Sequence, residues 1–190
     1  MPTFRDTDAL VIVDVQRDFL PGGALAVPEG DAVIPVLNRW IDAANAAGLP
    51  IVFTRDWHPA DHVSFEAQGG PWPPHCVQDT PGAAFDERLH LPDDATVVSK
   101  ATTAGAEAYS GFDTTDLAAM LRERGVERVL VGGLATDYCV RATVLDALDE
   151  GFEVRVIGEG VRGIAPDTVE AARAEMADAG ATFEEHATPA

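Results

Sequence analysis

Short apolar segments alternate along the chain with longer stretches in which apolar residues recur at helical spacing. The apolar segments are mostly rich in β-branched residues, which is typical of strands buried on both faces. They predict strands at residues 9–13, 50–54, 96–99, 128–132, 153–157 and 181–183. The amphipathic stretches predict helices at residues 31–47, 115–124, 139–150 and 166–179.

The alternation of strands and helices determines the fold class that we expect. Strands joined by helices pair side by side in a parallel sheet, because each helix brings the chain back to the end of the sheet at which the previous strand began. We therefore predict an α/β fold of three layers. It has a doubly wound, mainly parallel six-stranded sheet with helices on both faces, and it forms a single domain over residues 1–190.

Composition narrows the classes of partner. The 46% of hydrophobic and 24% of charged residues exclude a disordered chain, and 190 residues suit one domain. A formal net charge of −19 argues against nucleic acid or an anionic membrane as the main partner, and it leaves a small-molecule substrate open.

No apolar run approaches the roughly 20 residues of a membrane span, and the first residues lack the apolar core of a secretion signal. With only two cysteines, we expect a cytoplasmic protein without a disulfide framework; a homo-oligomer stays open.

Three chemically active side chains lie at the ends of predicted strands. Asp14 follows the first strand, Lys100 follows the third, and Cys139 comes after the fourth, where it opens a predicted helix. In doubly wound sheets the site lies at the carboxyl ends of the strands, near the reversal of strand order. Lys100 is the only lysine beside twelve arginines, which indicates a position that needs a compact ammonium.

Together these residues supply parts of acyl transfer through a thioester. The positive end of a helix dipole favours the thiolate, and a nearby carboxylate can take the thiol proton and return it to a leaving group. An ammonium keeps that carboxylate ionised, and backbone N–H groups at the helix start could form an oxyanion site. Taken singly, Asp14 could cap a loop, Lys100 could be a surface residue by chance, and Cys139 could be a small buried residue.

The segment 56–90 lacks periodicity and is rich in Pro, Gly and His, and a loop this long inside a domain is usually functional. Residues at i and i+2 of an extended chain project to the same side, so Asp56 and His58 can bind one ion, with His75 as a third ligand. Two imidazoles and a carboxylate leave positions open for water, as in catalytic metal sites. The alternative is a solvated loop that bears histidines. Cys76 could be a further ligand or thiol partner, but packing is its commoner role.

Seven features occur along the chain in a fixed order: DVQRDF at 14–19, PGGAL at 21–25, DWHPADH at 56–62, WPPHC at 72–76, Lys100, YSGF at 109–112 and GLATDYCV at 133–140. This set resembles the nicotinamidase branch of the isochorismatase-like cysteine hydrolases over nearly the whole chain. The sequence departs from the family pattern at Arg17, where many members carry Asn, and at Ala101, where Gly is common. Neither change removes a group with a chemical role.

The resemblance implies roles for individual residues. Cys139 would be the nucleophile, Asp14 the general base and then acid, and Lys100 the third catalytic member. A cis peptide would join Leu134 to Ala135, and the N–H groups of Ala135 and Cys139 would bind the oxyanion. The implied metal is a divalent ion, zinc before iron or manganese. Its ligands would be Asp56, His58 and His75, with His62 as a further ligand or a group of the second sphere. The implied substrate-binding residues are Phe19, Trp72, Tyr109, Leu134 and Ala135.

The function that the resemblance implies is hydrolysis of nicotinamide to nicotinate and ammonia through a cysteine thioester, in the salvage of NAD breakdown products. Two alternatives stay open. One is another amidohydrolase or isochorismatase of the same superfamily, although an isochorismatase need not use a cysteine. The other is a non-catalytic protein that binds a metal or senses redox state through Asp56, His58, His75 and Cys76.

Overall fold

The six predicted strands form one parallel sheet in the computed structural model, which describes residues 4–184. The strands are β1 (Asp8–Val13), β2 (Ile51–Asp56), β3 (Thr96–Lys100), β4 (Arg128–Leu134), β5 (Glu153–Arg162) and β6 (Thr182–Glu184). Their order across the sheet is β3-β2-β1-β4-β5-β6, and every neighbouring pair is parallel. The predicted fold class is confirmed. The first three residues and the tail expected after the last strand lie outside the described residues.

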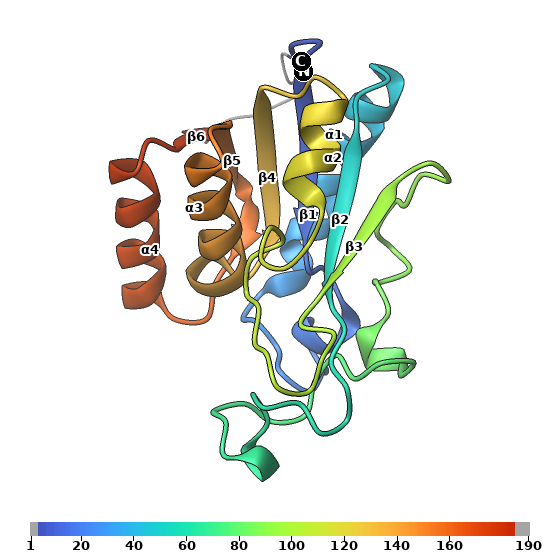
Figure 1. Cartoon of the computed structure of the whole chain (residues 1–190), viewed down its shortest axis with the longest axis vertical. Coiled ribbons are helices and arrows are strands. Elements are labelled where there is room, and N and C mark those ends of the chain that lie inside the picture. The colour runs from blue at the N-terminus through green and yellow to red at the C-terminus, as the bar shows by residue number, and fades with distance from the viewer. Residues whose placement is uncertain (1–3, 185–190) are drawn as a thin grey trace.

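The helices cover the two faces of the sheet unequally. They are α1 (Val33–Ala46), α2 (Leu117–Glu123), α3 (Arg141–Asp149) and α4 (Pro166–Asp178). Apolar residues of α2, α3 and α4 share one core with one face of the sheet, whereas α1 alone packs on the other face (Figure 1). The crossover from β2 to β3 contains only short 3-10 turns, and its residues Cys76, Ala83 and Leu89 complete the core beneath α1. None of the helices described is both long and apolar enough to cross a membrane.

Strand order reverses between β1 and β4, the two central strands. The chain runs outward from β1 to β2 and β3, and then returns beside β1 as β4 before running to the other edge. All strands point downward in Figure 1, so their carboxyl ends face the loops at the bottom of the view. This end of the sheet is where doubly wound folds place their sites.

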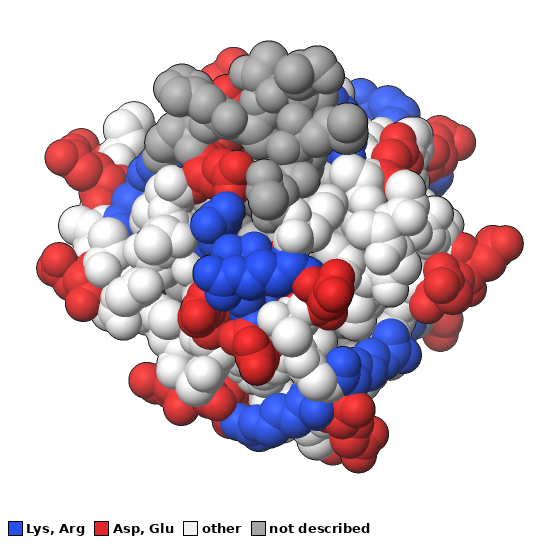
Figure 2. All heavy atoms as spheres, turned by 90° about the horizontal axis from the view of Figure 1, so that it is seen from above, with Lys and Arg blue, Asp and Glu red and all other residues white. Residues whose placement is uncertain are grey.

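The opposite end of the molecule carries charge of both signs. Figure 2 looks down on the amino ends of the strands and shows basic side chains with acidic ones beside them. Lys100 is buried, so the basic groups exposed on this face are arginines. The figure shows small groups of both signs instead of one broad basic area.

Most predicted boundaries agree with the structure to within two residues, and two differences change the surroundings of the site. β5 runs five residues further than expected, to Arg162, beyond a register irregularity in its pairing with β4 between Val131 and Gly133. Cys139 does not open a regular helix, because it lies within a π-helical turn, Thr136–Val140, and α3 begins at Arg141. The carbonyl of Ala135 accepts N–H bonds from Tyr138 and Val140, both at 3.1 Å, which widens the turn that carries the thiol.

Gly133 allows the two central strands to approach each other just before the site. Its φ is +128°, and a Cβ at this position would lie 2.0 Å from the Val13 carbonyl oxygen. We expect Gly133→Ala to lower the free energy of unfolding by about 3 kcal/mol, because it combines a steric clash with an unfavourable backbone conformation. Urea denaturation measures this. Gly105→Ala, where the added Cβ meets no atom within 4 Å, is the matched control and should unfold at the wild-type midpoint; equal midpoints for all three proteins would contradict the prediction.

Candidate active site

The ends of four strands meet at one buried ammonium. Lys100, the last residue of β3, places its Nζ 2.9 Å from Asp14 Oδ2 and 3.4 Å from Cys139 Sγ. The same Nζ forms an ion pair with Asp56 Oδ1 at the end of β2 and donates to the carbonyl of Ala108 at 3.3 Å. The structure therefore brings together the three residues that the sequence placed at strand ends, and adds Asp56 to them.

Asp14 is held where it can reach the thiol. It follows β1 with a φ of +49°, is fully buried, and accepts a hydrogen bond from the Thr54 hydroxyl at 2.7 Å. A carboxylate oxygen of Asp14, one of Asp56 and the Cys139 sulfur all lie within 4.8 Å of one another. The left-handed backbone at Asp14 turns its side chain back across the sheet end, toward the turn that carries Cys139.

Burial determines the resting proton positions. It raises the pKa of Asp14, an effect that Lys100 opposes, and it raises the pKa of the Cys139 thiol well above its usual value. Burial alone would lower the pKa of Lys100, but the two carboxylates raise it well above normal, so the ammonium stays charged. The start of a helix is thus not enough to ionise the thiol, which keeps its proton until a base takes it.

A second group of ligand-type atoms surrounds the other oxygen of Asp56. His58 Nε2 lies 3.5 Å and His75 Nε2 4.0 Å from Asp56 Oδ2, and all three residues are buried. His75 Nδ1 donates to the Pro73 carbonyl at 2.8 Å, which leaves the lone pair of Nε2 directed at this group. Burial alone would raise the pKa of Asp56, but Lys100 and His58 bring it below its usual range.

This donor set fits a divalent ion. One carboxylate oxygen and two imidazole nitrogens lie within 4.8 Å of one another, and burial lowers the pKa of His75, which favours the neutral imidazole that a metal needs. His58 Nδ1 has no hydrogen-bond partner among residues 4–184. Besides its Nε2 contact with Asp56, the ring packs against His62 at a centroid distance of 4.2 Å, tilted by 34°, and meets Phe65 edge-on. The arrangement suits zinc and similar borderline ions.

Both ring nitrogens of His62 are already engaged. Its Nδ1 accepts from the Ser64 hydroxyl at 2.7 Å and its Nε2 donates to the Ala106 carbonyl at 3.0 Å. Direct ligation would require breaking one of these bonds. A role in the second sphere of the metal would keep both bonds, and the His62 ring packs against that of His58.

Gln16 fixes Asp56 through its backbone. The carboxamide Nε2 donates to the Asp56 carbonyl at 2.8 Å, and the Oε1 accepts from the Asp56 N–H at 2.8 Å. This pair of bonds continues the contact between the β1 and β2 segments past the end of β1. Because Asp56 belongs both to the Lys100 cluster and to the group of metal-type ligands, its position couples the two.

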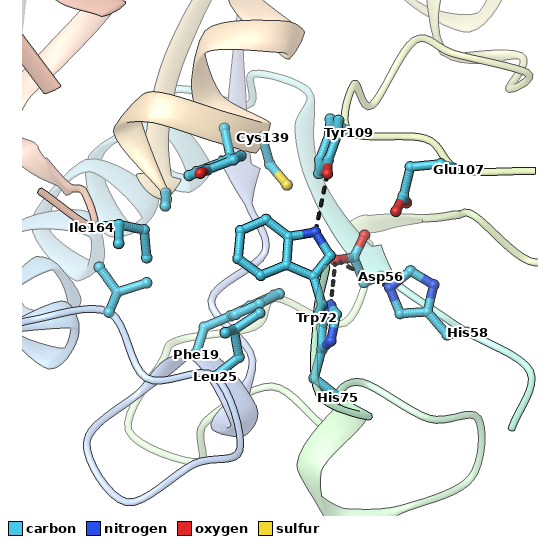
Figure 3. A pocket seen from close by; sticks show the side chains of 13 residues that line it. Phe19, Leu25, Asp56, His58, Trp72, His75, Glu107, Tyr109, Cys139 and Ile164 are labelled. Atoms are coloured by element: carbon cyan, nitrogen blue, oxygen red, sulfur yellow. Dashed lines mark hydrogen bonds and ion pairs between the residues drawn. The ribbon is translucent and has the colours of Figure 1, made fainter. Parts of the chain in front are cut away.

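An aromatic pocket opens between these two groups (Figure 3). The Cys139 sulfur points into it, with Asp56, His58 and His75 on one side and the indole of Trp72 across the middle. Trp72 Nε1 donates to the Tyr109 hydroxyl at 3.0 Å. The cavity between these walls has a volume of about 40 Å³.

The pocket contains most but not all of the predicted substrate-binding residues. Phe19, Trp72, Tyr109 and Ala135 line it, whereas the Leu134 side chain is fully buried in the core beneath α1. Leu134 points away because alternate residues of a strand face opposite sides of the sheet. The peptide bond between Leu134 and Ala135 is cis, as the resemblance implied.

Five further residues line the pocket and were not predicted: Leu25, Val27, Glu107, Tyr138 and Ile164. Tyr138 could have been found, because it lies next to the nucleophile in a helical turn. Glu107 is the one charged group among them, and its position seven residues after Lys100 in an irregular segment gives no periodic signal. Leu25 and Val27 come from one loop, and Ile164 comes from another loop far away in the chain.

Comparison with known proteins gives consistent results. A model of the isochorismatase domain matches residues 8–188. The chain is 42% identical to a nicotinamidase of Escherichia coli, over 92% of this chain and 93% of that protein. Among solved structures, it resembles a pyrazinamidase of Pyrococcus horikoshii in complex with zinc, at 54% identity and a TM-score of 0.92, covering 95% of this chain and 99% of that one.

A second solved structure is PnC1 from L. infantum in complex with nicotinate. It is 38% identical, with a TM-score of 0.88, and the match covers 96% of this chain and 95% of that one. The resemblance to these proteins extends over almost the whole length on both sides. The chain therefore belongs to the isochorismatase family, alongside the nicotinamidases.

Proposed function

We propose that this protein is a nicotinamidase, which hydrolyses nicotinamide to nicotinate and ammonia through a thioester on Cys139. The observation that carries the proposal is the placement of the Lys100 ammonium between Asp14, Asp56 and Cys139 at the wall of an aromatic pocket. This geometry joins a thiol and a base to a group of metal-type ligands. The E. coli and L. infantum relatives, named as a nicotinamidase and a nicotinate complex, support the choice of substrate.

The pocket positions a flat heteroaromatic amide. Phe19 and Trp72 offer apolar ring surfaces to a pyridine, and Cys139 lines the same pocket. Binding of the ring therefore orients the carboxamide toward the Cys139 sulfur. Asp56, His58 and His75 would hold the divalent ion. When bound, that ion supplies a Lewis acid for a ring nitrogen or a water molecule.

The reaction then follows from the buried proton donors and acceptors. Asp14 takes the thiol proton of Cys139, and the sulfur forms a bond to the carboxamide carbon. The N–H groups of Ala135 and Cys139 stabilise the tetrahedral oxyanion, and Asp14 returns the proton to the amide nitrogen, which leaves as ammonia. Asp14 next accepts a proton from a water molecule as the water oxygen attacks the thioester carbon. The carbon–sulfur bond then breaks, Asp14 returns this proton to the sulfur to restore the thiol, and the acid leaves as nicotinate, with its remaining proton taken up by ammonia or solvent. Throughout, the Lys100 ammonium offsets part of the negative charge of Asp14 and Asp56.

The alternatives differ in what they require of the second cysteine. A redox or metal sensor would need Cys76 to be reactive, yet Cys76 is fully buried in the core beneath α1, and burial raises its pKa well above the usual value. An enzyme whose nucleophile is a free thiol must keep that thiol reduced, so we also propose a cytoplasmic location.

Replacing the nucleophile tests the chemistry. Cys139→Ala should lower the rate of ammonia release from nicotinamide by about 1,000-fold or more, because no other group in the cluster can form the thioester. Far-ultraviolet circular dichroism and zinc content should stay at wild-type values. Ammonia production near the wild-type rate would contradict the assignment of Cys139.

The lone lysine gives a second test. Its Nζ is fully buried among three side-chain partners and the Ala108 carbonyl, so the larger planar guanidinium of Lys100→Arg cannot keep the same contacts. We expect kcat/KM for nicotinamide to fall about 100-fold or more, the loss typical of a misplaced catalytic group. Arg39→Lys, an exchange of the same two residue types at an exposed position of α1, serves as control and should keep full activity. Normal turnover by Lys100→Arg would show that this site does not need an ammonium.

The metal ligands are tested by metal content. After dialysis against zinc, the zinc content per chain of His75→Ala should be lower than that of wild type by about 10-fold or more, because the variant loses one of three protein ligands. His90→Ala is the matched control, because His90 is exposed and pairs with Asp42 away from the pocket. Chelation of wild type should stop ammonia release, and added zinc should restore it. If His75→Ala bound zinc as wild type does, the proposed ligand set would be wrong.

A further inference from the structure

Asp18 is an acidic residue close to the site that the proposed reaction does not use. It lies in the 3-10 turn Arg17–Phe19, and its carboxylate reaches the long crossover between β2 and β3. Its Oδ2 accepts a hydrogen bond from the Cys76 N–H at 2.7 Å, and its Oδ1 accepts from the Ala24 N–H at 3.3 Å. The carboxylate packs directly on Gly82, where a Cβ would lie 2.2 Å from Asp18 Oδ2. The surrounding backbone therefore leaves a defined space for this one carboxylate.

The backbone of Cys76 connects the two histidines of the proposed metal site. Cys76 directly follows His75, and its carbonyl accepts the N–H of His58 at 3.0 Å. Its N–H is the group that Asp18 holds. Both polar backbone groups of Cys76 are thus engaged, one by a carboxylate and the other by a residue that presents a metal-type nitrogen.

Cys76 also has a backbone conformation that needs support. Its φ is +46°, in the left-handed region that residues other than glycine seldom adopt. A short hydrogen bond to an ionised carboxylate is among the stronger bonds available to a backbone N–H. Without it, the peptide after His75 has an unfavourable conformation and one fewer partner, and the imidazoles of His58 and His75 are free to separate.

We infer that Asp18 is a positioning residue for the metal site: by holding the Cys76 peptide, it sets the spacing of His58 and His75. The inference rests on the metal site of the proposed function. Asp18 acts through Cys76 and is not among the residues that line the pocket. Its predicted effect is therefore on metal affinity and not on the reactivity of the thiol.

The test measures zinc affinity and thiol reactivity separately. Zinc affinity of the full chain is determined by competition with a chromophoric chelator. The alkylation rate of Cys139 is measured on the metal-free protein by mass spectrometry of its peptide. We expect Asp18→Ala to lower zinc affinity about 10- to 100-fold, the range found when a residue that orients a metal ligand is lost. The alkylation rate of Cys139 should stay within about twofold of wild type, because Asp14 and Lys100 keep their contacts.

Two further variants separate positioning from charge. Asp18→Asn keeps one acceptor oxygen and should retain more zinc affinity than Asp18→Ala. Asp61→Ala removes the same charge from an exposed position of the same crossover, and it should bind zinc as wild type does.

Each contrary result has a distinct meaning. Wild-type zinc affinity in Asp18→Ala would overturn the inference while leaving the proposed function intact. An equal loss in Asp61→Ala would show an effect of net charge and would also overturn it. A loss of zinc affinity accompanied by a changed Cys139 alkylation rate would indicate general disruption of the site, again against the inference. Failure of the wild type to bind zinc would refute the metal site itself, and with it the inference.

Discussion

A single buried ammonium is the constraint on which the site depends. Lys100 lies between the carboxylates of Asp14 and Asp56, out of contact with water, and it also touches the Cys139 sulfur. Removing one partner from such a group leaves an uncompensated charge in the interior, which typically costs about 3–5 kcal/mol. With both carboxylates ionised, the cluster carries a formal charge of −1 in a buried place. A divalent ion beside the second oxygen of Asp56 would offset that charge, so electrostatics and ligand chemistry favour the same occupant.

The sheet makes this arrangement possible. The four groups come from the ends of β1, β2 and β3 and from the turn after β4, which are neighbours only because strand order reverses between β1 and β4. Gly133 allows β4 to pass close to Val13, and the Ala135 carbonyl organises the turn that carries Cys139. The reacting groups are therefore held at or next to strand ends, which position side chains more precisely than loops do.

The sequence predicts well the features that depend on periodicity and local chemistry. All six strands and four helices follow from apolar spacing, and the strand-end rule correctly brings Asp14, Lys100 and Cys139 together. Prediction from the sequence fails where the position of a side chain depends on contacts between residues that are distant in the chain. The bond between Lys100 and Asp56, the inward position of Glu107 and the engagement of both His62 nitrogens depend on how irregular loops fold over the sheet. Leu134 shows the remaining limit, because a residue next to the site by number can belong to the core by strand geometry.

The residues that line the pocket are held by loops, whereas the buried ammonium and its partners are held at the strand ends. Trp72 belongs to the crossover after β2 and Tyr109 to the segment after β3, and the hydrogen bond between their side chains ties these loops together. The Trp72 ring also meets the ring of Tyr138 edge-on at 5.2 Å, and Tyr138 adjoins the nucleophile. The loops therefore set the position of a bound ring relative to the sulfur without moving the strand ends. Leu25 and Ile164, from other loops, also line the pocket, so we expect exchange of such wall residues to change which amide fits, while the buried ammonium and its partners keep the same reaction.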